Sequence, residues 1–163
     1  MNYKIMILAP SAGGKSTLMR YLREHSDLHV AETDEEVIKA NDGQWPSDDY
    51  KDKVLLPKTT GEIISQNNVV YLVKDIPKGL LQKARANGFK IIVLKLTLEQ
   101  LSERDSKRIK EESYVSAARW FKGQLDYLDS LDNENLIDGY IDGNLPTAQI
   151  ANEVVDLAVN QHK

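Results

Sequence analysis

Short apolar runs alternate with amphipathic segments along the whole chain. The runs predict five β-strands, at residues 3–8, 29–31, 69–73, 89–96 and 136–141. Helices are predicted between them, at residues 15–23, 34–40, about 49–65, 77–87 and 113–131, and two more begin near residues 97 and 146. Three strands are apolar on both faces, as in a parallel sheet covered on each side. The pattern predicts a layered α/β domain.

The composition is that of a globular protein. The chain has 163 residues, 41% of them apolar and 28% charged, with three histidines and no cysteine. This suits one domain and excludes disulfides and thiolate metal sites. The apolar run at residues 1–8 is too short for a signal peptide, and no later run could cross a membrane. We expect a single cytoplasmic domain over residues 1–163, with its oligomeric state left open.

A phosphate-binding motif follows the first predicted strand. Residues 9–17 read Ala-Pro-Ser-Ala-Gly-Gly-Lys-Ser-Thr and lead from a buried strand into a helix, the context that a phosphate loop requires. The glycines let backbone amides turn inward beside the helix N-terminus, which makes an anion cradle. Lys15 can reach the terminal phosphates, and the Ser16 hydroxyl can bind Mg²⁺. The predicted ATP-binding residues are Ser11, Ala12, Gly13, Gly14, Lys15, Ser16 and Thr17.

Two carboxylates, Glu32 and Asp34, follow the second predicted strand. Ligands of open α/β sheets bind at the carboxyl ends of the strands. A carboxylate there can hold Mg²⁺ through water or accept the proton of an attacking hydroxyl. Asp34 is the first candidate for such a role and Glu32 the second. Asp34 is also a good N-cap for the helix that follows, and the two roles are compatible.

Charge is unevenly distributed, although the net charge is only −4. Residues 32–52 carry eight acids against two lysines, and residues 104–122 carry six bases against three acids. Arg104 and Arg108 are four residues apart, on one face of a helix. Arginines stabilise the charge that spreads over a transferring phosphoryl group. The alternative is a solvated helix face, but the phosphate loop favours a catalytic role for both arginines.

These segments together resemble the nucleoside-monophosphate-kinase-like group of P-loop kinases, which includes shikimate and gluconate kinases and the 5′-hydroxyl polynucleotide kinases. The resemblance spans nearly the whole chain. It rests on residues 9–17, on residues 32–34, on the pair Arg104 and Arg108, and on Ile-Asp-Gly-Asn at residues 141–144. It implies a three-layer P-loop kinase fold with a five-stranded parallel sheet in the order 2-3-1-4-5.

The same resemblance implies roles for several segments. Glu32 and Asp34 would contact Mg²⁺ and the acceptor, and we assign Glu32 with Ser16 to the metal. Residues 104–119 would form a mobile lid that supplies arginines, including Arg119. The loop after the last strand would touch adenine through Asp142 and Asn144.

The acceptor is predicted from departures from the group's pattern. Shikimate kinases carry Gly-Gly after the third strand, where this chain has Lys74-Asp75. Nucleotide kinases present an arginine to the acceptor's phosphate after the second strand, and residues 32–68 contain no arginine. We therefore predict transfer of the γ-phosphate of ATP to a hydroxyl of a small metabolite or nucleoside-type acceptor. It would bind beside the insertion at about 34–66, whose Trp45 and Tyr50 could wall a pocket.

Two alternatives remain. The first is a nucleic-acid kinase that acts on a 5′-hydroxyl or a modified base. It is disfavoured because the acidic residues 32–52 would repel a phosphate backbone, whose contacts dominate nucleic-acid affinity. The second is a regulatory protein that binds ATP and transfers no phosphate.

Overall fold

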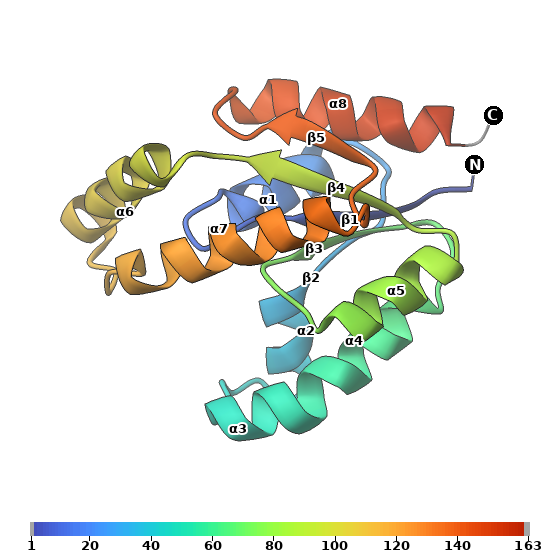
Figure 1. Ribbon diagram of the computed structural model, residues 1–163, viewed down its shortest axis with the longest axis horizontal. Coiled ribbons are helices and arrows are strands. Elements are labelled where there is room, and N and C mark those ends of the chain that lie inside the picture. The colour runs from blue at the N-terminus through green and yellow to red at the C-terminus, as the bar shows by residue number, and fades with distance from the viewer. Residues whose placement is uncertain (1, 162–163) are drawn as a thin grey trace.

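The computed structural model describes residues 2–161, which form a layered α/β domain (Figure 1). The strands are β1 (Lys4–Leu8), β2 (Val30–Glu32), β3 (Val69–Val73), β4 (Lys90–Lys95) and β5 (Gly139–Asp142). The helices are α1 (Lys15–His25), α2 (Thr33–Ala40), α3 (Asp48–Tyr50), the π-helical turn η1 (Lys51–Leu55), α4 (Leu56–Ile64), α5 (Lys78–Ala86), α6 (Leu98–Glu112), α7 (Ala118–Asn133) and α8 (Thr147–Asn160). Most elements lie within a few residues of their predicted positions.

The five strands form one parallel sheet in the order β2-β3-β1-β4-β5. This confirms the predicted fold and strand order. β1 is the central strand, with Leu8 level with Val73 of β3 and with Val93 of β4. The carboxyl ends of all five strands therefore meet at one edge, where the loops that follow them lie together.

Helices cover both faces of the sheet. On one face, Ile5 and Ile7 of β1 lie in a core cluster with residues of α1 and α8. On the other, Met6 and Leu8 lie in a cluster with residues of α4, α5 and α7. Figure 1 shows α8 on one side of the sheet and α4 and α5 on the other. Because β1 is buried on both sides, its sequence is a continuous apolar run rather than an alternating one.

Helix boundaries differ from prediction at three places. The predicted helix at 113–131 begins only at Ala118, and residues 113–117 form an irregular turn-like connection without helical structure. Buried Asp105 holds this turn, because its carboxylate accepts bonds from the Ser116 hydroxyl (2.6 Å) and the Ala117 amide (2.9 Å). The predicted helix at 49–65 exists, but a π-helical turn interrupts it at η1. The helix predicted from residue 34 begins at Thr33.

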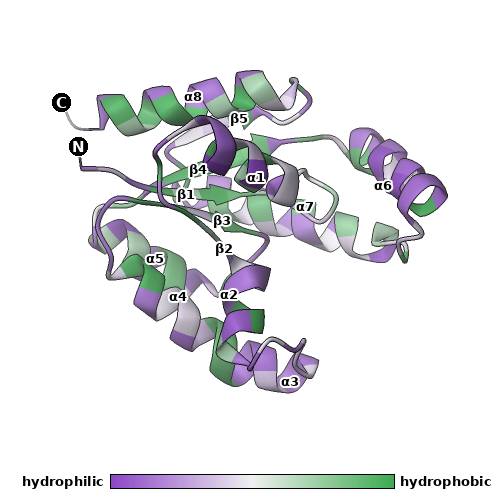
Figure 2. Cartoon of the chain, turned by 180° about the vertical axis from the view of Figure 1, so that it is seen from behind, coloured by the Kyte–Doolittle hydropathy of each residue, from purple (hydrophilic) through white to green (hydrophobic). Residues whose placement is uncertain are grey.

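Helix α6 and the segment around α3 extend away from the sheet. Figure 1 shows α6 and α3 projecting on the same side of the molecule. Figure 2 shows that α6 is largely hydrophilic. It starts with a capping box between Thr97 and Gln100, and its buried Leu101 belongs to a small core cluster with Leu96 and Phe121. No helix in the described part of the chain is long and apolar enough to span a bilayer.

Candidate active site

The loop between β1 and α1 is folded tightly against its own start. The Gly13 amide donates to the Pro10 carbonyl at 3.0 Å. A Cβ on Gly13 would lie 2.7 Å from that carbonyl oxygen, so any side chain would distort the turn. Gly14 has a left-handed backbone (φ +89°), which disfavours other residues, and it immediately precedes α1. These two glycines let residues 12–17 wrap around the N-terminus of α1 as an anion cradle.

Lys15 lies at the bottom of this cradle. Its ammonium donates to the carbonyls of Ala9 (3.0 Å) and Pro10 (3.1 Å), which leaves one of its three N–H groups for a ligand. Burial lowers the pKa of Lys15 to about 8, while the nearby carboxylates of Asp34 and Glu32 act in the opposite direction. A charged amine held in a partly desolvated site is strongly attracted to an anionic ligand.

The carboxylates after β2 differ in setting. Glu32 is buried and is the N-cap of α2, since its side chain accepts a bond from the Glu35 amide at 3.0 Å. The expectation that Asp34 caps this helix was wrong. Asp34 lies in the first turn and is exposed. Burial, and secondarily the charge of Asp34, raises the pKa of Glu32.

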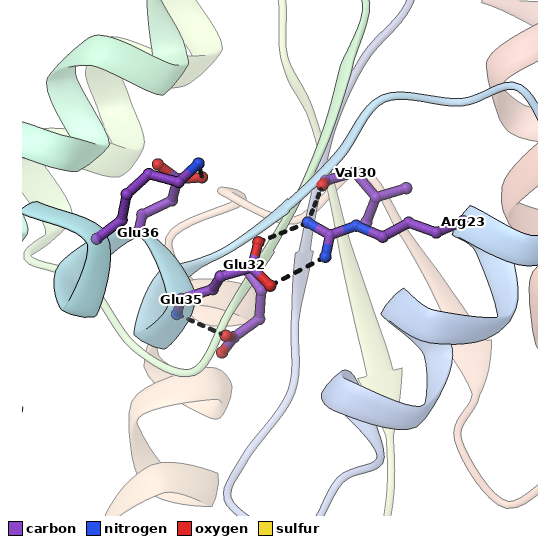
Figure 3. Close-up of polar contacts among 6 residues, drawn as sticks. Arg23, Val30, Glu32, Glu35 and Glu36 are labelled. Atoms are coloured by element: carbon purple, nitrogen blue, oxygen red, sulfur yellow. Dashed lines mark hydrogen bonds and ion pairs between the residues drawn. The ribbon is translucent and has the colours of Figure 1, made fainter. Parts of the chain in front are cut away.

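An ion pair joins the start of α2 to the phosphate-loop helix. Figure 3 shows the Arg23 guanidinium of α1 between Glu35 and the Val30 carbonyl, with Glu32 beneath the Glu35 amide. Arg23 donates twice to the Glu35 carboxylate, at 2.6 and 2.9 Å, and once to Val30 at 2.7 Å. The short strand β2 and the first turn of α2 are thereby fixed relative to α1.

The predicted lid arginines have different surroundings. Arg104 donates to the Gly143 carbonyl at 2.7 Å and also approaches the loop glycine Gly14. Arg108 lies over the ring of Tyr114, with 4.2 Å between the guanidinium carbon and the ring centroid. Arg119 instead lies over Trp120 and does not line the site.

The loop after β5 is joined to the site through Arg104, which donates to its Gly143 carbonyl. The Asp142 carboxylate accepts a bond from the Asn144 amide at 2.9 Å, which shapes the turn. A Cβ on Gly143 would lie 2.7 Å from Leu96, so the loop packs closely against the chain after β4. Asp142 and Asn144 are both exposed and do not line the cavity described next.

One cavity of about 670 Å³ brings most of the predicted residues together. It is lined by Ser11, Ala12, Gly13, Gly14, Lys15, Ser16, Thr17, Arg20, Glu32, Asp34, Lys74, Arg104, Lys107, Arg108, Glu111, Glu112, Tyr114 and Ala117. We call it the phosphate-loop cavity. Its lining contains six bases and four acids, so it suits an anionic ligand better than the net charge of the chain suggests.

Of the acidic insertion at about 34–66, only Asp34 lines this cavity. None of the lining residues lies between residues 35 and 73. Trp45 and Tyr50 are about half exposed, at 51% and 46%, and neither packs into the core or walls the cavity. The charge of residues 42–52 therefore does not describe the environment of a ligand at the phosphate loop.

Sequence reasoning missed several residues of the site, and two of them, Lys74 and Gln124, contact or influence the phosphate loop. Lys74 follows β3, lines the cavity, and lowers the pKa of Lys15 through its charge. Gln124 of α7 is buried, and its amide binds Ser11 twice: its oxygen accepts from the Ser11 amide (2.9 Å) and its nitrogen donates to the Ser11 hydroxyl (3.0 Å). A signal for Gln124 was present, because it is the polar member of an otherwise apolar buried stripe of α7.

The residues present fit a nucleotide with its magnesium ion. Among residues 2–161, no three His, Cys, Asp or Glu side chains converge into a metal-binding group. Mg²⁺ needs no such group, because it is commonly held by one or two protein oxygens together with phosphates and waters. The Ser16 hydroxyl and the carboxylates of Glu32 and Asp34 line the same cavity as the anion cradle and can supply those oxygens.

The parallel order 2-3-1-4-5, with the phosphate loop after the central strand, defines the P-loop kinase fold of the nucleoside-monophosphate-kinase-like group. Solved structures with this fold include shikimate kinase from Bacteroides thetaiotaomicron, with a TM-score of 0.73 and 11% identity over 96% of this chain and 98% of that one. Shikimate kinase from Acinetobacter baumannii, in complex with shikimate, has a TM-score of 0.69 and 17% identity, covering 97% and 93%.

A gluconokinase from Sinorhizobium meliloti 1021 is similar to the same extent. Its TM-score is 0.66 and its identity 20%, over 98% of this chain and 95% of that one. The sequence matches no protein-family model and no curated protein. At these identities the likeness establishes the fold, and the chemistry must be argued from the site itself.

We predict that the affinity of this cavity for a nucleotide depends on pH, because the pKa of Lys15 is lowered to about 8. A bound polyphosphate favours the charged amine, so above about pH 8 binding must take up a proton. The dissociation constant of a non-hydrolysable ATP analogue should be constant below pH 7 and rise above pH 8, by at most about tenfold per pH unit. Titration calorimetry in buffers of different ionisation enthalpy would measure both the affinity and the proton uptake. Lys15→Met should abolish the slope, and an unchanged slope in that variant would contradict the assignment.

We also predict that residues 98–117 become better protected when nucleotide binds. This segment is joined to the phosphate loop and the loop after β5 mainly through Arg104 and the small cluster at Leu101, and such weakly attached regions open at low cost. Hydrogen exchange with and without an ATP analogue would measure the change, with α8 as the internal reference. Strong and equal protection in both states would mean a rigid helix.

Proposed function

We propose that the protein is an ATP-dependent kinase that transfers the γ-phosphate to a hydroxyl group of a small acceptor. The observation that carries the proposal is the phosphate-loop cavity, which brings the anion cradle, the exposed carboxylate of Asp34 and the guanidinium groups of Arg104 and Arg108 together. Phosphoryl transfer requires these three components: a phosphate grip, a group that orients the nucleophile, and positive charge for the transition state.

Each component has a residue of this chain. Lys15 and the amides of residues 12–17 would hold the phosphates, and Ser16 with Glu32 would hold Mg²⁺, which would neutralise charge on the phosphates when bound. The Ser11 amide donates to Gln124, so Ser11 serves the cradle as an anchor rather than through that amide. Arg108 is the mobile positive charge of the lid, whereas Arg104 stays attached to Gly143.

The acceptor would enter on the side of the cavity where β2 and β3 end. Asp34 is exposed there, and it can accept the proton of the attacking hydroxyl. Lys74 lines the same cavity and makes no hydrogen bond or ion pair within residues 2–161. The fold neighbours include proteins named for shikimate and gluconate, which are small hydroxy acids. A compact, hydroxyl-bearing metabolite is the acceptor that this arrangement favours.

A nucleic-acid kinase is the second candidate. The argument against it came from the acidic residues 32–52, of which only Glu32 and Asp34 line the cavity. The exposed Arg20 and Lys107 also line it and could contact a phosphate backbone. The two candidates differ in how strongly salt lowers the affinity for the acceptor. A polyanion releases several counterions when it binds, and a small metabolite does not.

A screen with labelled ATP tests the proposal. The acceptors would be hydroxy acids, sugars, nucleosides, and single- and double-stranded oligonucleotides at low and moderate salt. We expect efficient transfer to one small acceptor, and a loss of about 10²-fold or more in Lys15→Ala, the scale of other preorganised charge contacts. Efficient and salt-sensitive labelling of oligonucleotides would favour the second candidate. Tight ATP binding without transfer to any acceptor would indicate a regulatory protein.

Asp34→Asn should lower turnover by about 10²-fold or more and leave affinity for an ATP analogue nearly unchanged, because only acid–base and metal roles are lost. Stability should fall by less than about 1 kcal/mol, since the change removes one favourable charge from the first turn of α2. Steady-state kinetics and chemical denaturation would measure both quantities. Asp156→Asn, on the exposed side of α8, is the matched control. Turnover within twofold of wild type would leave Asp34 as a helix-dipole residue only.

A further inference from the structure

A buried polar residue on α7 holds the first turn of the phosphate loop. The fully or largely buried positions of α7 are Phe121, Gln124, Leu128 and Leu131. Gln124 is 7% exposed, and in this apolar stripe its amide would be costly without partners. Both ends of the amide are bonded to one residue, Ser11, which lies 113 positions away in the sequence. Because both the oxygen and the nitrogen of the Gln124 amide bond Ser11, the contact fixes the position of Ser11 and also contributes to stability.

A small apolar cluster joins the phosphate loop to α6 and α7. Ala12, the next residue of the phosphate loop, packs against the cluster of Leu96, Leu101 and Phe121. Ala117, from the turn between α6 and α7, packs against the same cluster. One small core therefore contains the tip of the phosphate loop, the start of α6 and the start of α7.

The connection between α6 and α7 is hydrogen-bonded to α6 at its last residues. Asp105 of α6 binds the Ser116 hydroxyl and the Ala117 amide, directly before α7 begins. These bonds tie α6 to the residues directly before α7. Gln124 lies less than two turns from that end of α7, so Ser11 is connected to α6 through Gln124 and the first turns of α7.

We propose that Gln124 is a positioning residue that couples the phosphate loop to the α6–α7 hairpin. By holding the amide and hydroxyl of Ser11, it keeps residues 12–14 in the shape of the anion cradle. In return, the cradle filled by a nucleotide stabilises the closed position of α6 and its Arg108. The proposal rests on the nucleotide binding proposed above. It adds the contact, between Gln124 and Ser11, through which nucleotide binding at the phosphate loop would affect α6 and α7.

The test compares two variants of similar shape and one control. Gln124→Met keeps the volume and loses both hydrogen bonds, whereas in Gln124→Glu the carboxylate can accept from the Ser11 amide and from its hydroxyl, which can rotate to donate. Gln149→Met makes the same change at an exposed position of α8 that forms no side-chain bond within residues 2–161. The measurements are hydrogen exchange of residues 9–17 and 98–117, with and without an ATP analogue, and the affinity for that analogue.

We expect Gln124→Met to speed hydrogen exchange of residues 9–17 in the free protein and to lower the affinity for the ATP analogue about tenfold. The same variant should lose the nucleotide-induced protection of residues 98–117. Gln124→Glu should restore the slow exchange of the free loop, and Gln149→Met should behave as wild type. If Gln124→Met fails to fold, Ser11→Ala removes one of the two bonds without altering α7 and should shift the same quantities by less.

Two results would overturn the proposal. One is wild-type exchange and wild-type nucleotide affinity in Gln124→Met. The other is a lower melting temperature with unchanged affinity and unchanged protection of residues 98–117, which would make Gln124 a packing residue. Failure of the wild-type protein to bind the analogue would instead refute the proposed function, and the exchange of the free loop would still report on the contact with Ser11.

Discussion

The site depends on the parallel pairing of β1 with a neighbour on each side. This pairing places the end of β1 level with the end of β3, and the Ala9 amide continues the ladder by donating to the Val73 carbonyl at 3.0 Å. β3 in turn pairs with β2, which puts Glu32 level with Leu72. The phosphate loop, Lys74 and the carboxylates therefore meet at one edge because the backbone ladder fixes where each strand ends. Side chains alone could not set these distances.

Much of the fold could be predicted from sequence, because its signals are local. β1 and β3 are apolar on both faces, and residues 9–17 contain their own turn and helix start. The start of α2 was predicted one residue too late. Asp and Asn are among the usual N-caps, but the N-cap of this helix is Glu32. Residues 113–117 were predicted as helical but are not, because the Ser116 hydroxyl and the Ala117 amide donate to the carboxylate of Asp105, which lies more than ten residues earlier in the chain. The strand order itself was implied by resemblance, since short strands carry no signal for their neighbours.

The site was partly predictable for the same reason. The cradle, Lys15 and Asp34 lie beside recognisable strand ends, and the cavity brings them together. Lys74 could not be assigned, because its importance comes from neighbours that are distant in sequence. Gln124 stands out as a polar residue in an apolar stripe of α7, but its partner Ser11 lies 113 positions away and carried no signal. The charge of residues 42–52 was misleading because a sum along the chain does not tell which side of the molecule the charges face. Tertiary contacts decide which charges a ligand meets.

The π-helical turn η1 makes the direction of the 41–50 segment adjustable. Such a turn accommodates one more residue than an α-helical turn, and in a helix each residue rotates the chain by about 100°. Residues before and after Lys51–Leu55 therefore have a different rotation about the helix axis, relative to one another, from the one that an uninterrupted α-helix would give them. Loss of one residue from η1 would swing the outer end of the segment around its axis without disturbing the sheet. A change of chain length within η1 is thus a simple means by which evolution could change the orientation of residues 41–50 relative to the sheet.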